Sequence, residues 1–411
     1  MHPGAEGARA RLSALMFLEY FVWGSWTVTL ATYVGRTLAF SGVEIGLLYT
    51  TGAIAAIVSP FFVGTLADRF FATERMLALL HLLGGGLLWA ASSTTRFAPL
   101  YLVLLGYAIL FMPTLALCIS ISFDHLPEPG SDFPRVRVLG TAGWIAAGVL
   151  VGQLRLEATP LPLRIAAISS LALAAFCLTL PHTPPHAAEA RAAMRGLVGR
   201  DVLRLLRDPA FAVFMAGAFL IAVPAQFYAA FMNLYLNEVG VRAAATRMTL
   251  GQASEGTFML LLPWLLPRLG VKWLLLAGMA GWVVRYALLA LNGPGAMEPL
   301  LYGAILLHGL CYGCFFLTAQ IYVAERADVR IRAAAQGFFT LAALGVGSLL
   351  GSWAAGSAVD AFALPAAAAG HDWRSIWLIP AAAALVVTVL FAFAFRPGPS
   401  PRPVTAFPAP D

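Results

Sequence analysis

Residues 98–122, APLYLVLLGYAILFMPTLALCISIS, form an apolar stretch of 25 residues without a charged side chain. About 20 apolar residues are enough for a helix to cross the hydrocarbon core of a bilayer. Twelve such stretches can be marked along the chain, over 12–34, 45–66, 76–93, 98–122, 137–154, 161–180, 209–236, 247–266, 271–291, 298–324, 331–358 and 373–395. The sequence therefore predicts an all-α membrane protein with twelve transmembrane helices.

The composition of the whole chain agrees with this prediction. Of 411 residues, 60% are hydrophobic and 11% are charged, whereas about 25% of the residues in a soluble domain are charged. These values exclude a soluble globular enzyme and a disordered chain. The net charge is +6, but the arginines are scattered between apolar stretches, so we expect no nucleic-acid partner. The four cysteines lie inside apolar stretches, where a disulfide framework is not expected.

The basic residues predict the orientation in the membrane. With both termini cytoplasmic, 18 of the 26 Lys and Arg residues face the cytoplasm, 7 face outward, and Arg285 remains inside a helix. This asymmetry follows the positive-inside rule and favours a multi-pass protein of the bacterial inner membrane. Arg9 and Arg11 precede the first stretch, as in a secretory signal. That stretch is too long for a signal and no cleavage site follows, so we expect a retained helix.

A long polar interval divides the twelve stretches into six and six. The expected organisation is an N-terminal six-helix bundle over 1–180, a cytoplasmic linker with an amphipathic helix over 181–208, a C-terminal six-helix bundle over 209–396, and a disordered tail over 397–411. This plan resembles the major facilitator superfamily, whose two bundles are pseudo-symmetric repeats.

The loop between the second and third stretches supports the same resemblance. Its sequence GTLADR, residues 64–69, resembles a loop signature of the superfamily. Asp68 can cap a helix end and pair with an arginine, so Asp68 and Arg69 are candidates for a gating loop. The alternative is an ordinary charged loop.

Ionisable and amide side chains within the apolar stretches are the candidate site residues, because each is costly against lipid and should face a partner or a cavity. Arg137, Thr141 and Trp144 share one face of the fifth stretch. A guanidinium, a hydroxyl and an indole can together hold a planar polar ring by hydrogen bonds and stacking. Alternatively, Arg137 only marks the cytoplasmic end of the helix.

The seventh and eighth stretches carry further amides and an acid. Gln226 and Asn233 lie on one face of the seventh stretch, where they can contact substrate or bond neighbouring helices. Gln252 and Glu255 lie three residues apart on the eighth. A carboxylate in a low dielectric can take up and release a proton near neutral pH, as a proton-coupled carrier requires. The alternative for Glu255 is a static ion pair, for example with Arg285.

Two other stretches contribute candidates. Glu19, followed by tryptophans at i+4 and i+7, is a second candidate for proton coupling, and an ion pair with an arginine is its alternative. The tenth stretch carries Tyr312, Phe316 and Gln320 as candidate substrate contacts, with His308 on the face of Tyr312. Its aromatic rings suit stacking of a planar ring, although such stripes also serve helix packing.

No enzyme motif is present. The sequence contains no G-x-x-x-x-G-K-[ST], H-E-x-x-H or G-x-S-x-G. Cys311 and Cys314 are spaced as C-x-x-C but lack a second pair. We therefore expect no catalytic residues, no metal and no cofactor.

Motifs along most of the chain resemble the nucleoside:proton symporter family of the major facilitator superfamily. DFPRVRVLGTAGW at 132–144 and QASE at 252–255 are the specific ones. FLEYFVWGSW, FMPTLAL, RAAAQG and DWRSIWL, which begin at Phe17, Phe111, Arg332 and Asp372, support the resemblance.

The resemblance implies uptake of purine and pyrimidine nucleosides together with a proton. The nucleoside contacts that it carries over are Arg137, Thr141, Trp144, Gln226, Gln252 and Glu255. This chain departs from the family where one member has a Phe-Asp pair and Tyr312-Gly313 stands here. An amide expected one turn after Gln226 is Ala229.

We therefore expect a monomeric carrier that works by alternating access and whose partners are a nucleoside, a proton and membrane lipid. The base would stack near the midplane on Trp144 and the aromatic rings of the tenth stretch, while Arg137 and the amides bind its edge and the ribose. A carrier for a sugar or a drug, or a membrane receptor without transport activity, remains an alternative.

Overall fold

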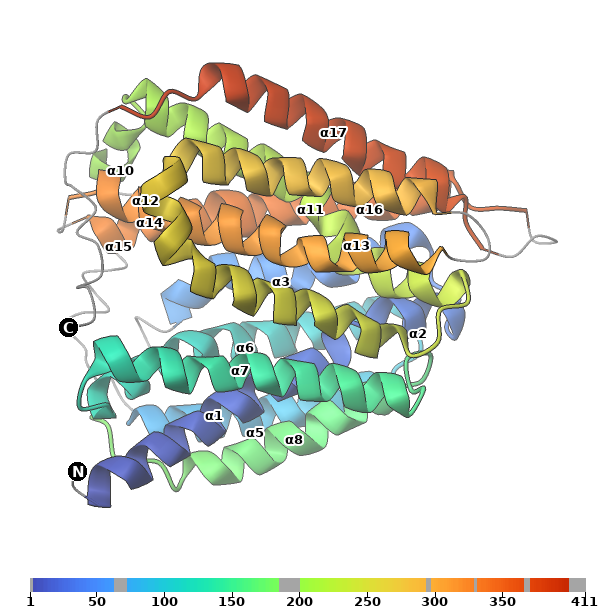
Figure 1. Ribbon diagram of the computed structural model, residues 1–411. Coiled ribbons are helices and arrows are strands. Elements are labelled where there is room, and N and C mark those ends of the chain that lie inside the picture. Colours follow the sequence, from blue (N-terminus) through green and yellow to red (C-terminus); the bar gives the residue numbers. More distant parts are fainter. Residues whose placement is uncertain are drawn as a thin grey trace. The chain divides into compact units, whose positions relative to one another are not determined.

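The computed structural model describes residues 3–62, 72–184, 200–292, 297–328, 331–365 and 370–398 (Figure 1). Within these ranges the regular secondary structure is helical, apart from an isolated bridge between Ala363 and His371. The chain divides into two compact units. Unit 1 is Met1–Met194 with Arg242–Thr249, and unit 2 is Arg195–Val241 with Leu250–Asp411.

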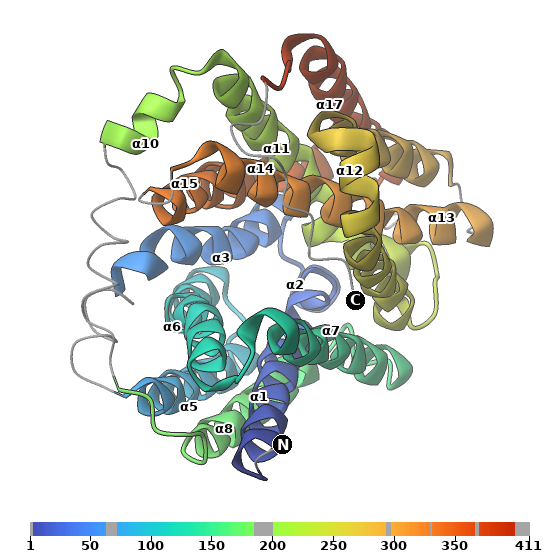
Figure 2. The same ribbon diagram turned by 60° about the vertical axis from the view of Figure 1, so that its left-hand side comes forward.

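Unit 1 is a bundle in which α1 packs along α7 and α8, and α5 packs against α6 and α8 (Figure 2). A Cβ atom on Gly143 of α7 would lie 2.1 Å from the carbonyl oxygen of Phe17, so glycine permits the close approach of α7 to α1. The helices of this unit are α1 (Pro3–Thr27), α2 (Leu30–Arg36), α3 (Gly42–Phe62), α5 (Thr73–Ser92), α6 (Phe97–His125), α7 (Pro129–Gln153) and α8 (Leu161–Cys177).

In unit 2, α11 packs against α16, α17 and η3. Two of its helices contain wider π-helical turns, so α13, η2 and α14 follow one another without a break, as do α15, η3 and α16. The elements are α10 (Arg200–Leu205), α11 (Pro209–Glu238), α12 (Ala244–Leu291), α13 (Glu298–Gly309), η2 (Leu310–Leu317), α14 (Thr318–Arg326), α15 (Arg332–Phe339), η3 (Thr340–Gly347), α16 (Ser348–Ala361) and α17 (Trp373–Ala394). The first residues of α12, up to Thr249, belong to unit 1.

A single glycine divides α12, which is 48 residues long, into two arms. Gly270 has φ 72° and ψ 166°, a backbone conformation that side chains with a Cβ rarely adopt. The break coincides with the interval between the apolar stretches 247–266 and 271–291. Two apolar segments therefore follow one another with almost no connecting loop.

Helices long and apolar enough to span a membrane dominate both units. The described residues contain nine of them, and two shorter apolar helices cover Gly42–Val58 and Leu161–Cys177. The prediction of a helical membrane protein is confirmed. Three predicted features lie wholly or mainly outside the described residues: the gating pair Asp68 and Arg69, most of the linker 181–208, and the tail 397–411 except 397–398.

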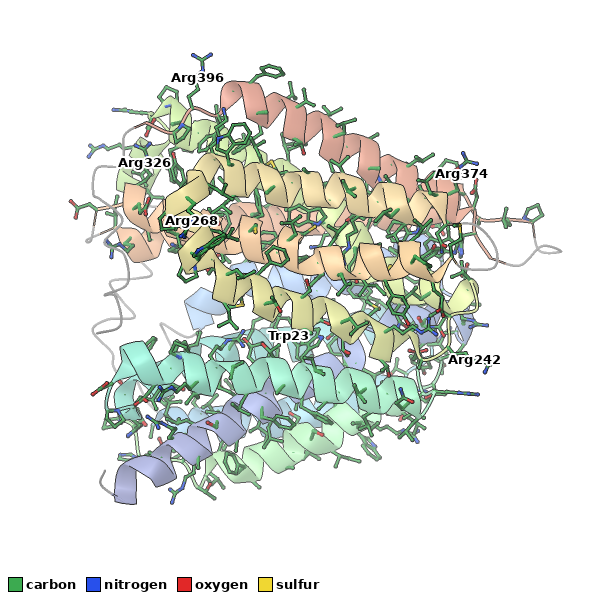
Figure 3. The ribbon with its side chains drawn as sticks, in the orientation of Figure 1. Trp23, Arg242, Arg268, Arg326, Arg374 and Arg396 are labelled. Carbon is green, nitrogen blue, oxygen red and sulfur yellow. The ribbon has the colours of Figure 1, made fainter. Side chains whose placement is uncertain are left out.

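Basic residues gather by side in unit 2. Arg268, Arg326 and Arg396 lie at one end of the unit, and Arg374 lies at the other end (Figure 3). The first three belong to the group that the sequence places in the cytoplasm, and Arg374 belongs to the outer group. The fold of unit 2 therefore separates these four arginines as the positive-inside rule requires.

Candidate functional site

In unit 1, the face formed by Arg137, Thr141 and Trp144 lies against α1. The guanidinium carbon of Arg137 lies 4.2 Å from the centre of the Tyr20 ring. The Trp144 ring contacts Trp23 edge-on, with 5.4 Å between ring centres. All three residues of this face are half-buried, so they can still meet a solute.

Glu19 lies in a fully buried polar cluster of the same unit. Its Oε2 atom is 2.9 Å from His81 Nε2, and the Thr114 hydroxyl donates to Oε1 over 2.6 Å. His81 Nδ1 lies 3.4 Å from the hydroxyl of Ser170. Glu19 therefore pairs with a histidine of α5 instead of an arginine, and it ties α1 to α5 and α6.

His81 is not among the site residues predicted above, although its position in the sequence carries a signal. His81 is an ionisable residue in the middle of LALLHLLGGG, residues 77–86, inside the third apolar stretch. Such residues in spanning helices almost always have a polar partner. The partner itself could not be read from the sequence, because it depends on the rotation of α5 about its axis.

The amides of α11 bond within unit 2. Gln226 Nε2 donates to Ser348 Oγ over 2.9 Å, and Ser352 Oγ donates to Gln226 Oε1 over 3.5 Å. Asn233 is buried, and its backbone carbonyl accepts a hydrogen bond from Asn237 Nδ2 over 2.9 Å. Gln226 thus joins α11 to α16, which is the interhelical bonding named above as its alternative role.

Glu255 lies beside a histidine that is in turn bonded to an arginine. Its Oε2 atom is 3.5 Å from His308 Nε2, and the opposite ring nitrogen, Nδ1, is 3.3 Å from Nη2 of Arg285. The Arg285 guanidinium lies over the Tyr228 ring, 3.1 Å from its centre. The alternative of an ion pair between Glu255 and Arg285 is thereby modified, since His308 joins the two groups.

Burial differs sharply along this chain of side chains. Arg285 is fully buried, and among the described residues its Nε and Nη1 atoms have no hydrogen-bond partner. The His308 side chain is 10% exposed, and that of Glu255 is 35% exposed. The buried positive charge of Arg285 is therefore connected through His308 to the partly exposed carboxylate of Glu255.

A stack of aromatic rings in the tenth stretch begins at the histidine. Tyr312 stacks on His308 with 4.3 Å between ring centres, and Phe316 continues from Tyr312 at 5.2 Å. Trp282 contacts both Tyr312 and Phe316 edge-on. Gln320 is exposed, and its backbone carbonyl accepts from the side chain of Gln336.

Gln252 and Gly313 lie on the helices of the eighth and tenth stretches. Gln252 is half-buried on α12. At Gly313, a Cβ atom would lie 2.9 Å from Cβ of Phe258, so an aspartate does not fit there unless the helices shift. Close packing thus accounts for the glycine where one family member has an acid.

Long apolar helices that enclose acidic, basic and amide side chains are typical of a helical membrane protein with a functional site between its helices. Residues 7–399 match the family model described as Nucleoside H+ symporter. The chain is 41% identical over 394 residues to the putative nucleoside transporter YegT of Escherichia coli (93% of this chain and 92% of YegT). It is 36% identical over 399 residues to the xanthosine permease of the same organism (93% and 94%).

A crystal structure of the nucleoside transporter NupG superposes with a TM-score of 0.86 at 30% identity, covering 95% of this chain and 100% of the NupG chain. The chain therefore belongs to the nucleoside H+ symporter family. Its resemblance to that family, indicated by the motifs around Arg137 and Glu255, is confirmed.

Proposed function

We propose that the protein takes up nucleosides together with protons by alternating access. The names of the relatives support this substrate class. The observation that carries the proposal is the partly exposed carboxylate of Glu255, which adjoins a buried arginine and a stack of aromatic rings. This group of side chains can both exchange a proton and bind a planar solute. Such groups are rare in apolar helices.

The fold proposed for this activity has twelve spanning helices in two six-helix bundles. The two arms of α12, the two shorter apolar helices and the remaining long helices supply these spans. We place the bundles at 1–180 and 209–396, with 181–208 as the linker and Asp68 and Arg69 as a gating pair. The chain acts as a monomer in the inner membrane with both termini cytoplasmic.

Aromatic rings and polar groups share the binding of the nucleoside in this proposal. The proposed stacking partners of the base are Trp144 in unit 1 and Tyr312 and Phe316 in unit 2. Gln226 exchanges its bond with Ser348 for a bond to the solute. The further polar contacts are Arg137, Thr141, Asn233, Gln252, Glu255 and Gln320.

Glu255 is the proposed proton-coupling residue, and Glu19 is the second candidate. In proteoliposomes with an inward pH gradient, the wild-type protein should accumulate labelled uridine. Glu255→Gln should abolish this accumulation, because the amide cannot ionise, while exchange of nucleoside across the membrane continues. Undiminished accumulation by Glu255→Gln, with its loss in Glu19→Gln, would assign coupling to Glu19.

Competition defines the substrate class in the same vesicles. An excess of unlabelled nucleosides should suppress uridine uptake, whereas sugars and lipophilic cations should leave it unchanged. A wild-type protein that binds uridine but moves none into the vesicles would contradict the carrier proposal.

A further inference from the structure

We infer that His308 and Arg285 are positioning residues that present a hydrogen-bond donor to the ionised form of Glu255. This inference rests on the proposed function, and it goes further by giving roles to two residues that the proposal does not use. It also offers a physical account of how a proton can be handled by a chain with Gly313 at the position of an acid.

The hydrogen bonds fix which ring nitrogen of His308 carries the proton. A guanidinium can only donate hydrogen bonds, so His308 Nδ1, 3.3 Å from Arg285 Nη2, must accept. A neutral imidazole that accepts at Nδ1 carries its proton at Nε2. That nitrogen faces Glu255 Oε2 at 3.5 Å, so the imidazole donates toward the carboxylate.

The same geometry assigns the transported proton to Glu255. Protonating His308 at Nδ1 would set an N–H group against the N–H group of Arg285. Protonating the carboxylate of Glu255 creates no such conflict. Arg285, His308 and Glu255 together have a net charge of zero while Arg285 is positive and Glu255 negative, and a net charge of +1 once Glu255 is protonated. The proton thus forms an O–H bond on Glu255, and His308 remains neutral in both states.

The surroundings hold the histidine in this orientation. Tyr312 stacks on its ring at 4.3 Å, and Tyr228 lies at 5.7 Å between ring centres. The titratable groups of unit 2 that surround Glu255, His308 and Arg285 are Tyr228 on α11, Tyr286 on α12, and Cys311 and Tyr312 on η2. Arg285 is the one permanent charge within the described set.

The two amide substitutions of His308 separate the roles of its nitrogens. Glutamine places an N–H donor near the position of Nε2 and can still reach Glu255. Asparagine reaches only the position of Nδ1 and leaves the carboxylate without its donor. Both replacements are neutral and polar, so they form a matched pair.

The test measures uridine affinity of the purified protein in detergent from pH 5.5 to 8.5. Loss of a donor to the ionised carboxylate favours its protonated form. His308→Asn should therefore move the midpoint of the pH profile upward by roughly 1 unit, a tenfold change in proton affinity. His308→Gln should stay near the wild-type midpoint. Equal midpoints for both variants and wild type would overturn the inference, as would equal shifts in both.

Three further variants distinguish a failure of this inference from a failure of the proposed function. Arg285→Met should shift the midpoint in the same direction as His308→Asn, because the fixed positive charge is lost. His371→Gln alters a histidine that lies outside the spanning helices and pairs with Glu238 at 3.0 Å, and it should keep the wild-type profile. If Glu255→Gln retains the wild-type pH dependence, the coupling proposal fails. If Glu255→Gln loses that dependence but His308→Asn and His308→Gln have the same midpoint, only the inference fails.

Discussion

Glu19 and Glu255 each approach the Nε2 atom of a histidine, at 2.9 Å and 3.5 Å, but their surroundings differ. The Glu19 pair is fully enclosed, and hydroxyl groups surround it. The Glu255 pair is partly exposed and adjoins a guanidinium. A titratable residue can exchange its proton with solvent only if solvent can reach it. The greater exposure of the Glu255 side chain therefore favours Glu255 as the coupling residue.

Asp372 provides a pH-dependent contribution to stability outside the spanning helices. It caps α17, and its carboxylate accepts hydrogen bonds from the hydroxyl and the backbone N–H of Ser375 over 2.6 and 3.3 Å. The hydroxyl bond, ahead of the other causes, holds the pKa of Asp372 below its ordinary value of 3.8. The stabilisation is therefore complete above that value and is lost as the pH falls through the lower folded-state pKa.

We predict that Asp372→Ala lowers the thermal unfolding midpoint in detergent at pH 7, as loss of an N-cap commonly costs about 1 kcal/mol. The difference from the wild type should shrink as the pH is lowered from 5 to 3. Ser375→Ala, which removes the hydroxyl donor, should reproduce much of the pH-dependent part. A difference that does not change with pH would rule out this linkage.

At the scale of elements, the backbone conformation of Gly270 determines where α12 is divided. A side chain at φ 72° is strained even though a Cβ atom there would meet nothing within 4 Å. Gly270→Ala should therefore destabilise the protein by about 1–2 kcal/mol, measured as a lower unfolding midpoint.

Gly256 in the same helix is the matched control for Gly270. A Cβ atom on Gly256 also meets nothing within 4 Å, but its backbone lies in the helical part of α12. Alanine there should be neutral or stabilising by up to about 1 kcal/mol. Equal effects of the two substitutions would show that strain at Gly270 is not the cause.

The sequence locates the elements better than it locates their contacts. Apolar length suffices to place α6, α11 and α17, because lipid imposes a minimum on each span. The prediction that His308 and Tyr312 share a face assumes 3.6 residues per turn. The wider π-helical turns of η2 alter that periodicity, and Phe316 is the residue that continues the stack.

Partners between helices were the part of the candidate site that periodicity could not supply. The sequence indicates that Glu19, Glu255 and Arg285 need polar neighbours. It does not indicate that His81 and His308 are those neighbours, because that depends on the rotation and crossing of separate helices. Family motifs identify the region around Glu255 but carry no information on this pairing.

At the scale of the whole molecule, the distribution of arginines predicts the direction in which the chain crosses the membrane. α17 has 22 residues, enough for about 33 Å at 1.5 Å per residue, and so can cross the hydrocarbon core. Arg374 lies at its start, Arg396 follows its end, and both are exposed. They lie at opposite ends of unit 2 (Figure 3).

Single cysteines at these two positions test the orientation. The four native cysteines are free and buried, so the wild-type protein should give little background with a membrane-impermeant maleimide. In right-side-out spheroplasts, Arg374→Cys should be labelled directly, and Arg396→Cys only after permeabilisation. The reverse pattern would place the C-terminus outside. Direct labelling of both positions would mean that α17 does not cross the membrane, because a crossing helix must separate its two ends by the thickness of the bilayer.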